Sequence, residues 1–229
     1  MSEGAPVRIM AIAAARTAGA APDAAPETQV SALVAYARAL AMAGVDVVQL
    51  RDLGMTSGLL ALSARSMADA IEGTATRLVV NDRADVAVAG RAAGVHLRAV
   101  SMPARRLRPV LGPRALIGRS MHAPADAGPL DVEGVDYVIF GTVFPSGSKP
   151  DGHPVAGLDA LEAQCRATPR PVLAVGGITV RRCADVAARG AAGVAAIGVF
   201  AEAWQRGGGA LEDVVAGMRA WLNGPEAGR

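Results

Sequence analysis

Residues 171–179 read Pro-Val-Leu-Ala-Val-Gly-Gly-Ile-Thr and show the pattern that decides the fold. Residues 171–175 form a short apolar run, which is typical of strands that are buried on both faces. Gly176 and Gly177 allow a tight turn, and a helical pattern begins at Val180. A strand, a glycine turn and a helix in this order predict one βα unit.

Eight runs of this kind alternate with eight helical patterns along the chain. The predicted strands are residues 8–14, 45–50, 77–80, 94–96, 115–118, 135–141, 171–175 and 193–197. The predicted helices are residues 28–43, 57–71, 85–91, 103–111, 123–132, 158–167, 180–189 and 209–222. Strict alternation predicts parallel strands that are joined by right-handed crossovers.

A chain of 229 residues suits one closed domain of this kind. The sequence therefore predicts an α/β fold, a single (β/α)8 TIM barrel that spans residues 1–229. Residues 19–26 are expected to form a flexible first loop, and residues 225–229 a frayed tail. The alternative is an open doubly wound sheet. No Gly-x-Gly-x-x-Gly turn follows the first strand, which argues against that alternative.

The composition indicates a closely packed protein of the cytoplasm. Hydrophobic residues make up 52% of the chain, with 27 glycines and only 3% aromatic residues. The net charge of +2 is too small to indicate a nucleic acid partner. The one dense basic stretch, with Arg105, Arg106, Arg108 and Arg114, lacks aromatic residues for stacking on bases, so we interpret it as a solvated helix face.

Neither the cysteines nor the N-terminus indicates secretion. Cys165 and Cys183 lie in different predicted helices without metal-ligand spacing, so they are expected to be reduced thiols. Residues 7–15 are apolar, but they follow Glu3 and contain Arg8, unlike a signal peptide. No stretch is long enough to span a membrane, and none indicates a membrane partner. The oligomeric state stays open, with a homo-oligomer among the alternatives.

Polar side chains and glycines follow directly on several of the predicted strands. In a parallel barrel all these positions share one rim, because every strand delivers its C-terminal end to the same face. The positions are Arg51, Asn81, Asp82, His96, His122, Lys149, Gly176 and Gly177.

Two neighbouring loops of this rim predict a site for a phosphate monoester. Gly176-Gly177 follows the seventh strand and Ile197-Gly198 follows the eighth. Glycine lets backbone N–H groups approach an anion closely, and the start of a helix adds a positive dipole end. The alternative is that these glycines serve only the turn.

The long loop at residues 140–153 and the end of the third strand add further polar groups. The loop contains Thr142, Ser146, Ser148 and Lys149, and we expect Lys149 to face an anion. Asp82 could hold Mg²⁺ against a phosphate or cap the following helix, and the sequence does not choose between these roles.

The three histidines receive different interpretations. His96 has apolar neighbours and is expected to be a packed, hydrogen-bonded core residue, whereas His153 is expected to face solvent. His122 lies at the mouth of the fifth strand, with Ser120 two residues earlier on the same side. A neutral imidazole there could transfer a proton near pH 7, so His122 is the candidate catalytic residue. A structural role is the alternative.

Six motifs in order resemble the thiamine-phosphate synthase and TenI superfamily. They are Val48-Gln49-Leu50-Arg51, Val80-Asn81-Asp82-Arg83-Ala84-Asp85, Gly94-Val95-His96-Leu97, Gly118-Arg119-Ser120-Met121-His122, Gly141-Thr142-Val143-Phe144-Pro145 through Lys149, and Ala174-Val175-Gly176-Gly177-Ile178. The resemblance implies a phosphate-binding barrel of thiamin biosynthesis, with two known chemistries. Synthases join a pyrimidine pyrophosphate to a thiazole phosphate with Mg²⁺. TenI-type enzymes are metal-free and tautomerise a carboxythiazole phosphate, with a histidine that moves the proton.

The site motifs agree with the synthases at some positions and differ from them at others. By resemblance, Gln49, Arg51 and Asn81 match pyrimidine and pyrophosphate contacts, Asp82 matches a Mg²⁺ ligand, and Ser146, Ser148 and Lys149 match a Thr-x-Thr-Lys loop. The synthase pattern Arg-x-Lys reads Arg51-Asp52-Leu53 here, and Gly-Gln-x-Asp reads Arg98-Ala99-Val100-Ser101. One cation and one metal-binding carboxylate are therefore missing.

We therefore expect a TenI-like thiazole tautomerase that binds a small phosphorylated thiazole and needs no cofactor. In this mechanism His122 moves the proton, and Gly176, Gly177, Ile197 and Gly198 hold the phosphate. A Mg²⁺-dependent thiamine-phosphate synthase is the close alternative. A protein that binds a thiazole or thiamin phosphate without turnover is the second alternative.

Overall fold

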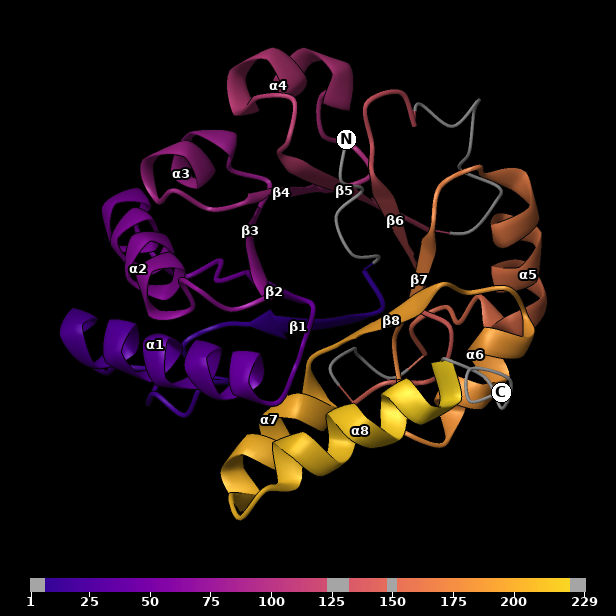
Figure 1. Cartoon of the computed structure of the whole chain (residues 1–229). Helices are drawn as coiled ribbons and strands as arrows, with labels where there is room; N and C mark the ends of the chain where they lie inside the picture. Colours follow the sequence, from indigo (N-terminus) through magenta and orange to yellow (C-terminus); the bar gives the residue numbers. More distant parts are fainter. Residues whose placement is uncertain (1–6, 123–131, 148–151, 223–229) are drawn as a thin grey trace.

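The computed structural model of the chain is a ring of parallel strands surrounded by helices (Figure 1). It describes residues 7–122, 132–147 and 152–222. The strands are β1 (Ile9–Ala13), β2 (Val47–Leu50), β3 (Arg77–Asn81), β4 (Gly94–Leu97), β5 (Leu116–Met121), β6 (Tyr137–Phe140), β7 (Val172–Val175) and β8 (Gly193–Ala196). Each strand pairs with the next, and β1 pairs in parallel with β8. The barrel is therefore closed, which confirms the predicted (β/α)8 fold and excludes the open sheet.

The helices lie outside the ring of strands (Figure 1). They are α1 (Pro26–Met42), α2 (Ser57–Ala70), α3 (Ala84–Ala89), α4 (Ala104–Leu111), α5 (Gly157–Ala167), α6 (Arg182–Ala188), α7 (Gly198–Arg206) and α8 (Ala210–Leu222). The first loop ends where α1 begins at Pro26. The tail at 225–229 lies outside the described residues, and so does the helix predicted at 123–132 except for its last residue.

One helix was missed by the sequence analysis, which placed a single helix after the eighth strand. The structure has two, because α7 begins at Gly198 directly after β8 and precedes α8. Phe200, Ala201 and Ala203 of α7 are buried, so packing stabilises a nine-residue helix whose first residue is a poor helix former. The eighth rim position is therefore a helix N-terminus rather than an open loop.

The side chains that point into the barrel form an apolar layer and, further along the strands, a polar layer above it. Val47 and Val79 belong to one buried cluster with Met10, Leu116, Tyr137 and Leu173. Two residues further along β2 and β3, on the same face, come Gln49 and Asn81. The polar side chains thus sit at the C-terminal ends of the strands, on top of a packed apolar floor.

Gly118 on β5 makes room for a tyrosine inside the barrel. A Cβ atom at position 118 would lie 2.1 Å from Cζ of Tyr137, so only glycine fits without moving the ring. Tyr137 is buried on β6, and its hydroxyl lies 3.2 Å from His96 Nδ1. The absence of a side chain at Gly118 therefore determines which group contacts His96 from below.

Both cysteines are free thiols, as predicted, and Cys183 is buried. The interpretation of the basic stretch as a solvated face holds for Arg105, Arg106 and Arg114, which are exposed. It is wrong for Arg108, whose guanidinium donates to the carbonyls of Ala115 and Gly134 and pairs with Asp136. Arg108 is thus a structural residue that ties α4 to the starts of β5 and β6.

Candidate active site at the carboxyl ends of the strands

The polar layer consists of four side chains from four consecutive strands. Gln49 Nε2 donates a hydrogen bond of 3.0 Å to Asn81 Oδ1, and Asn81 pairs in register with His96 on β4. His96 Nε2 lies 2.8 Å from Ser120 Oγ on β5. Gln49, Asn81 and Ser120, which the sequence assigned to substrate binding, are therefore brought together in one row.

Gln49 has spare bonding capacity in this row. Its side chain is buried, and its Oε1 has no hydrogen-bond partner within the described part of the chain. A buried acceptor without a partner costs free energy, so such atoms in native proteins usually meet a ligand or an ordered water. Gln49 Oε1 can therefore accept an N–H group of a bound molecule.

His96 is a packed core histidine, as predicted, but it also contacts the site. Its ring lies between Ser120 and Tyr137 and stacks on the tyrosine with 5.6 Å between ring centroids. Burial lowers the pKa of His96 to about 3, so the ring is neutral near pH 7. A neutral ring with both nitrogens occupied holds Ser120 in place, a role that the sequence analysis did not assign.

Asp82 lies where β3 ends, and both of its carboxylate oxygens have protein partners. Ser101 Oγ donates to Oδ1, and Arg98 Nε donates to Oδ2 over 2.5 Å. Burial alone would raise the pKa of Asp82, but the hydrogen bonds from Ser101 and Arg98 and the charge of Arg98 outweigh it and lower that pKa. The helix-capping alternative is wrong, because the N-cap of α3 is Arg83 and no side chain caps that helix.

These residues offer Mg²⁺ a single carboxylate, Asp82, and that carboxylate is already engaged by the protein. Mg²⁺ in proteins is bound through carboxylates together with substrate phosphates and water. Asp82 is engaged by a guanidinium and a hydroxyl, and Ser101 stands where the family pattern has the second carboxylate. No group of three or more candidate metal ligands occurs among the described residues.

The loop between β4 and α4, which carries Arg98 and Ser101, is held from below by Arg119. This arginine is almost completely buried on β5. Its Nη1 donates to the carbonyls of Ala99 and Ser101 over 3.1 and 3.3 Å, and its Nη2 donates to that of Met102 over 2.6 Å. The sequence analysis gave Arg119 no role. An arginine in the middle of an apolar strand was the signal that could have identified it.

A cavity of about 420 Å³ lies beside Asp82, between the ends of β2, β3 and β4. Its charged lining consists of Arg51, Asp52, Asp82, Arg83 and Arg98. Asp52 accepts backbone N–H groups of residues 15 and 54, and Arg83 is bound to residues 57 and 85. Arg51 is exposed and has no carboxylate partner among the described residues. The cavity therefore contains arginines that can meet an anion.

The two predicted phosphate loops lie side by side, because β7 pairs with β8. Gly176 and Gly177 have φ angles of 98° and 61°, which disfavour other residues. A Cβ atom at Gly176 would lie 2.4 Å from Thr142 Cγ2, and one at Gly177 would lie 2.4 Å from the carbonyl oxygen of residue 145. A Cβ atom at Gly198 would meet only a side-chain oxygen at 3.6 Å, so space does not require glycine there.

Arg182, which the sequence analysis did not identify, adds a positive charge beside this turn. Its Nη1 donates to the carbonyl of Gly177, and its guanidinium lies 4.6 Å from the centroid of the Phe144 ring. The signal in the sequence was the pair of arginines at the start of the helix after the double glycine.

The loop after β6 packs directly on the phosphate turns. The backbone N–H of Val143 donates to the carbonyl of Val175, and that of Phe144 donates to Gly176. Thr142 and Ser146 therefore lie in a loop that contacts the turn after β7. Ser148 and Lys149 lie outside the described residues.

His122 directly follows β5, as predicted, and its side chain is exposed. Its Nδ1 lies 3.1 Å from the carbonyl oxygen of Gly141. A carbonyl can only accept, so Nδ1 carries the proton of this bond, and in the neutral ring Nε2 is the nitrogen with a free lone pair. In this tautomer His122 is thus arranged to accept a hydrogen bond at Nε2.

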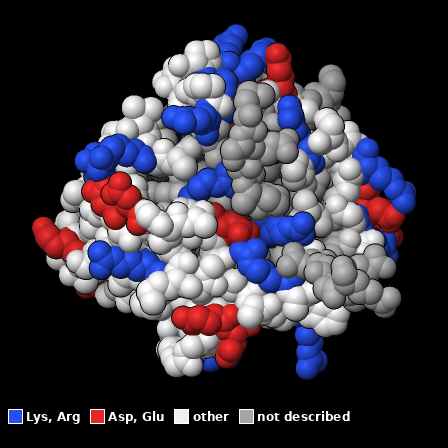
Figure 2. Space-filling model, in the orientation of Figure 1, with Lys and Arg blue, Asp and Glu red and all other residues white. Residues whose placement is uncertain are grey.

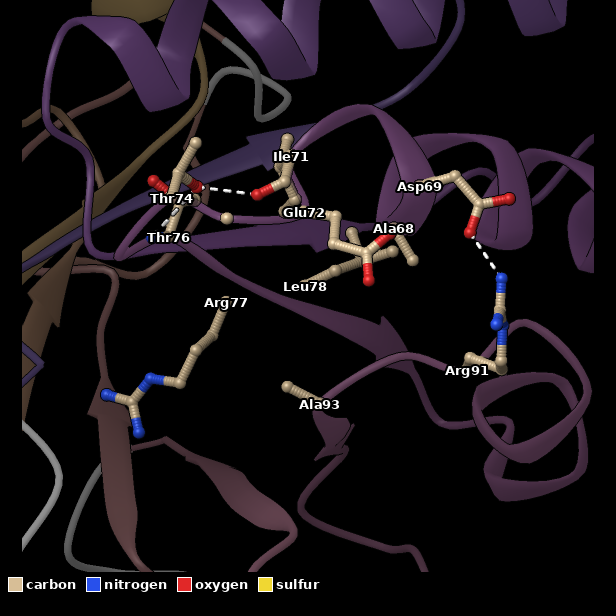
Figure 3. A pocket seen from close by; sticks show the side chains of 11 residues that line it. Ala68, Asp69, Ile71, Glu72, Thr74, Thr76, Arg77, Leu78, Arg91 and Ala93 are labelled. Atoms are coloured by element: carbon tan, nitrogen blue, oxygen red, sulfur yellow. Dashed lines mark hydrogen bonds and ion pairs between the residues drawn. The ribbon is translucent and has the colours of Figure 1, made fainter. Parts of the chain in front are cut away.

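A second cavity, of about 320 Å³, lies at the opposite end of the barrel (Figure 3). It is lined by Arg77, the first residue of β3, whereas Asn81 is the last. Asp69 and Arg91 form an ion pair of 2.6 Å at its edge, and Arg77 extends away from that pair (Figure 3). This cavity is therefore separate from the polar layer.

The surface of the molecule carries charged side chains of both signs. Positively and negatively charged side chains are interspersed over the face shown in Figure 2 rather than gathered by sign.

No helix in the described ranges combines the length and the apolar character that crossing a membrane requires.

Comparison with known proteins gives a consistent result. Residues 24–200 match the TMP-TENI family model, which is described as thiamine monophosphate synthase. The thiamine-phosphate synthase of Methanoculleus marisnigri is 42% identical over 161 residues, 70% of this chain and 76% of that protein. That of Methanocella arvoryzae is 40% identical over 69% of this chain and 74% of its own length. The thiamine phosphate pyrophosphorylase structure from Pyrococcus furiosus superposes with a TM-score of 0.73 over 95% of this chain and 96% of that one, at 24% identity.

Proposed function

Because this chain belongs to the thiamine monophosphate synthase (TMP-TENI) family, we propose that it joins a pyrimidine pyrophosphate to a thiazole phosphate and releases pyrophosphate. The observation that carries the proposal is the identity of about 40% to relatives that are named synthases, over some 70% of the chain. These relatives favour the synthase alternative over the TenI-like tautomerase that the sequence motifs led us to expect.

The geometry supports a reaction between two anionic substrates. At one side of the rim, the turns with Gly176, Gly177 and Gly198 are arranged for the thiazole phosphate. At the other side, the cavity with Arg51 and Arg98 is arranged for the pyrophosphate group. Asn81 lines this cavity, and Gln49, which donates a hydrogen bond to Asn81, lies next to it; in this proposal the two side chains bind the pyrimidine ring.

In this proposal the chain mainly positions the two reactants. The lone pair of the thiazole nitrogen forms the new C–N bond to the pyrimidine methylene carbon, and the C–O bond to pyrophosphate breaks with its electron pair leaving on the pyrophosphate oxygen. Holding the two groups in line lowers the entropic cost, and cationic side chains stabilise the charge that develops on the leaving group. No proton transfer is needed in this step, so the proposal gives His122 no acid/base role.

The test is to incubate the purified protein with pyrimidine pyrophosphate and thiazole phosphate, with and without Mg²⁺. We expect thiamin phosphate and pyrophosphate to form in equal amounts, catalytically and with saturation in both substrates. A second incubation supplies the carboxythiazole phosphate tautomer alone. If the second incubation converts this tautomer and the first forms no thiamin phosphate, the proposal is overturned in favour of a tautomerase. If the protein binds its ligands but neither incubation shows turnover, the proposal is overturned in favour of a carrier.

A further inference from the structure

We propose that Arg98 binds the pyrophosphate group of the substrate and supplies there the positive charge that, in the family pattern, comes from a lysine and from a metal ion held by carboxylates. This inference rests on the proposed function. It starts from the two departures from that pattern, Leu53 and Ser101. Leu53 lines the anion cavity with 77% of its surface exposed, so position 53 supplies no cation there.

Arg98 has hydrogen-bond donors that no protein group uses in the described part of the chain. Its Nε is bound to Asp82, while its two terminal nitrogens have no protein partner among the described residues. The side chain is 63% exposed and lines the cavity. Guanidinium groups bind phosphate oxygens through two parallel hydrogen bonds, which the free end of Arg98 can supply.

Three contacts fix the position of Arg98. Arg119 holds the backbone of its loop, and the backbone N–H of Arg98 donates to Ser101 Oγ over 3.0 Å. The side chain is then held by Asp82. Asp82 and Ser101, which correspond to metal ligands in the family pattern, thus act here as positioning residues for a cation.

The charges in the cavity agree with this assignment. Arg83 is held in two hydrogen bonds by Asp85, and Asp52 is held by backbone N–H groups, so neither is available to a ligand. Arg51 and Arg98 remain to face an anion that carries several negative charges. The negative charge of Asp82 repels that anion and should weaken its binding. At a metal site the same carboxylate would strengthen anion binding, so the two models predict opposite effects of Asp82.

The experiment measures binding of inorganic pyrophosphate by calorimetry, first in EDTA and then with Mg²⁺. We expect Arg98→Gln to weaken binding about tenfold or more in EDTA, with Arg98→Lys in between, because lysine keeps the charge but loses the planar pair of donors. Arg83→Gln is the matched control. It removes a cation from the same cavity, but one already bound to Asp85, so affinity should change by no more than about twofold.

The Asp82→Asn variant distinguishes the two models by the direction in which its pyrophosphate affinity changes. Asparagine keeps an acceptor for Arg98 and tolerates the φ of 56° at this position, so the variant should fold. Removing the negative charge should raise pyrophosphate affinity in EDTA about three- to tenfold. Loss of a Mg²⁺-dependent affinity in Asp82→Asn would overturn the proposal in favour of a metal site, and so would unchanged affinity in Arg98→Gln.

The inference and the proposed function can fail separately. If the protein forms no thiamin phosphate but Arg98→Gln loses pyrophosphate binding, the anion site stands and the synthase proposal falls. If thiamin phosphate forms and Arg98→Gln leaves the KM for pyrimidine pyrophosphate unchanged, the synthase proposal stands and the role of Arg98 falls.

Discussion

His96 shows how one buried residue links the stability of the barrel to its site. The ring takes no proton in the folded protein near neutral pH, because burial lowers its pKa to about 3. In the unfolded chain a histidine has a pKa of about 6.5, so below that pH the unfolded state binds a proton that the folded state does not. The contribution of His96 to stability is therefore complete above pH 6.5 and is lost as the pH falls toward 3.

The first prediction follows from this difference. The free energy of unfolding should fall by up to about 1.4 kcal/mol per pH unit as the pH drops below 6.5, in addition to the effect of the carboxylates. The His96→Asn variant should show a shallower fall between pH 6.5 and pH 5. Urea unfolding of both proteins across this range gives the two slopes. Equal slopes would mean that His96 is protonated in the folded state.

At the level of elements, the strands were easier to predict than the groups at their ends. The alternation of apolar runs and helical patterns determined all eight strands and the closure of the barrel, because burial on both faces leaves a simple signal. The sequence also placed Gln49, Asn81 and Ser120 on the correct rim. It could not show that Asp82 contacts Arg98, because that contact joins two loops and depends on side-chain packing. Helix α7 was missed because its stability comes from burial rather than from its sequence pattern.

The loop between β4 and α4 supplies the second prediction. Replacing Arg119 with methionine keeps an apolar stem but removes the donors that bind the carbonyls of residues 99, 101 and 102. We expect faster amide hydrogen exchange in residues 98–102 and weaker binding of inorganic pyrophosphate, since Arg98 loses its fixed position.

Arg108→Met is the control for this experiment. Arg108 also donates to two carbonyls and is bound to Asp136, but it does so at the starts of β5 and β6. Its loss should destabilise the barrel and leave pyrophosphate binding unchanged. If both variants weaken pyrophosphate binding equally, Arg119 acts through overall stability rather than through the loop.

At the scale of the whole molecule, the closed barrel keeps the two proposed anion sites on opposite parts of one rim. The pyrophosphate cavity belongs to β2, β3 and β4, whereas the phosphate turns follow β7 and β8. The polar row of Gln49, Asn81, His96 and Ser120 spans part of the distance between them. Each substrate can therefore be held by its own charged end while the reacting atoms meet above the apolar floor.

This separation leads to the last prediction, which combines Gly177→Val with Arg98→Gln. A valine at position 177 would collide with the carbonyl oxygen of residue 145 and require an unfavourable φ, so it should weaken binding of thiazole phosphate far more than that of the unphosphorylated thiazole alcohol. It should not change the affinity for inorganic pyrophosphate, and Arg98→Gln should show the reverse selectivity. Because the two positions share no contact, their effects on the free energy of ligand binding should add to within about 0.5 kcal/mol in the double variant. Calorimetry with thiazole phosphate, thiazole alcohol and inorganic pyrophosphate on the four proteins measures each term. If Gly177→Val weakens both thiazole ligands equally, or weakens pyrophosphate binding as strongly as Arg98→Gln does, the two anions are not held at separate ends of the rim.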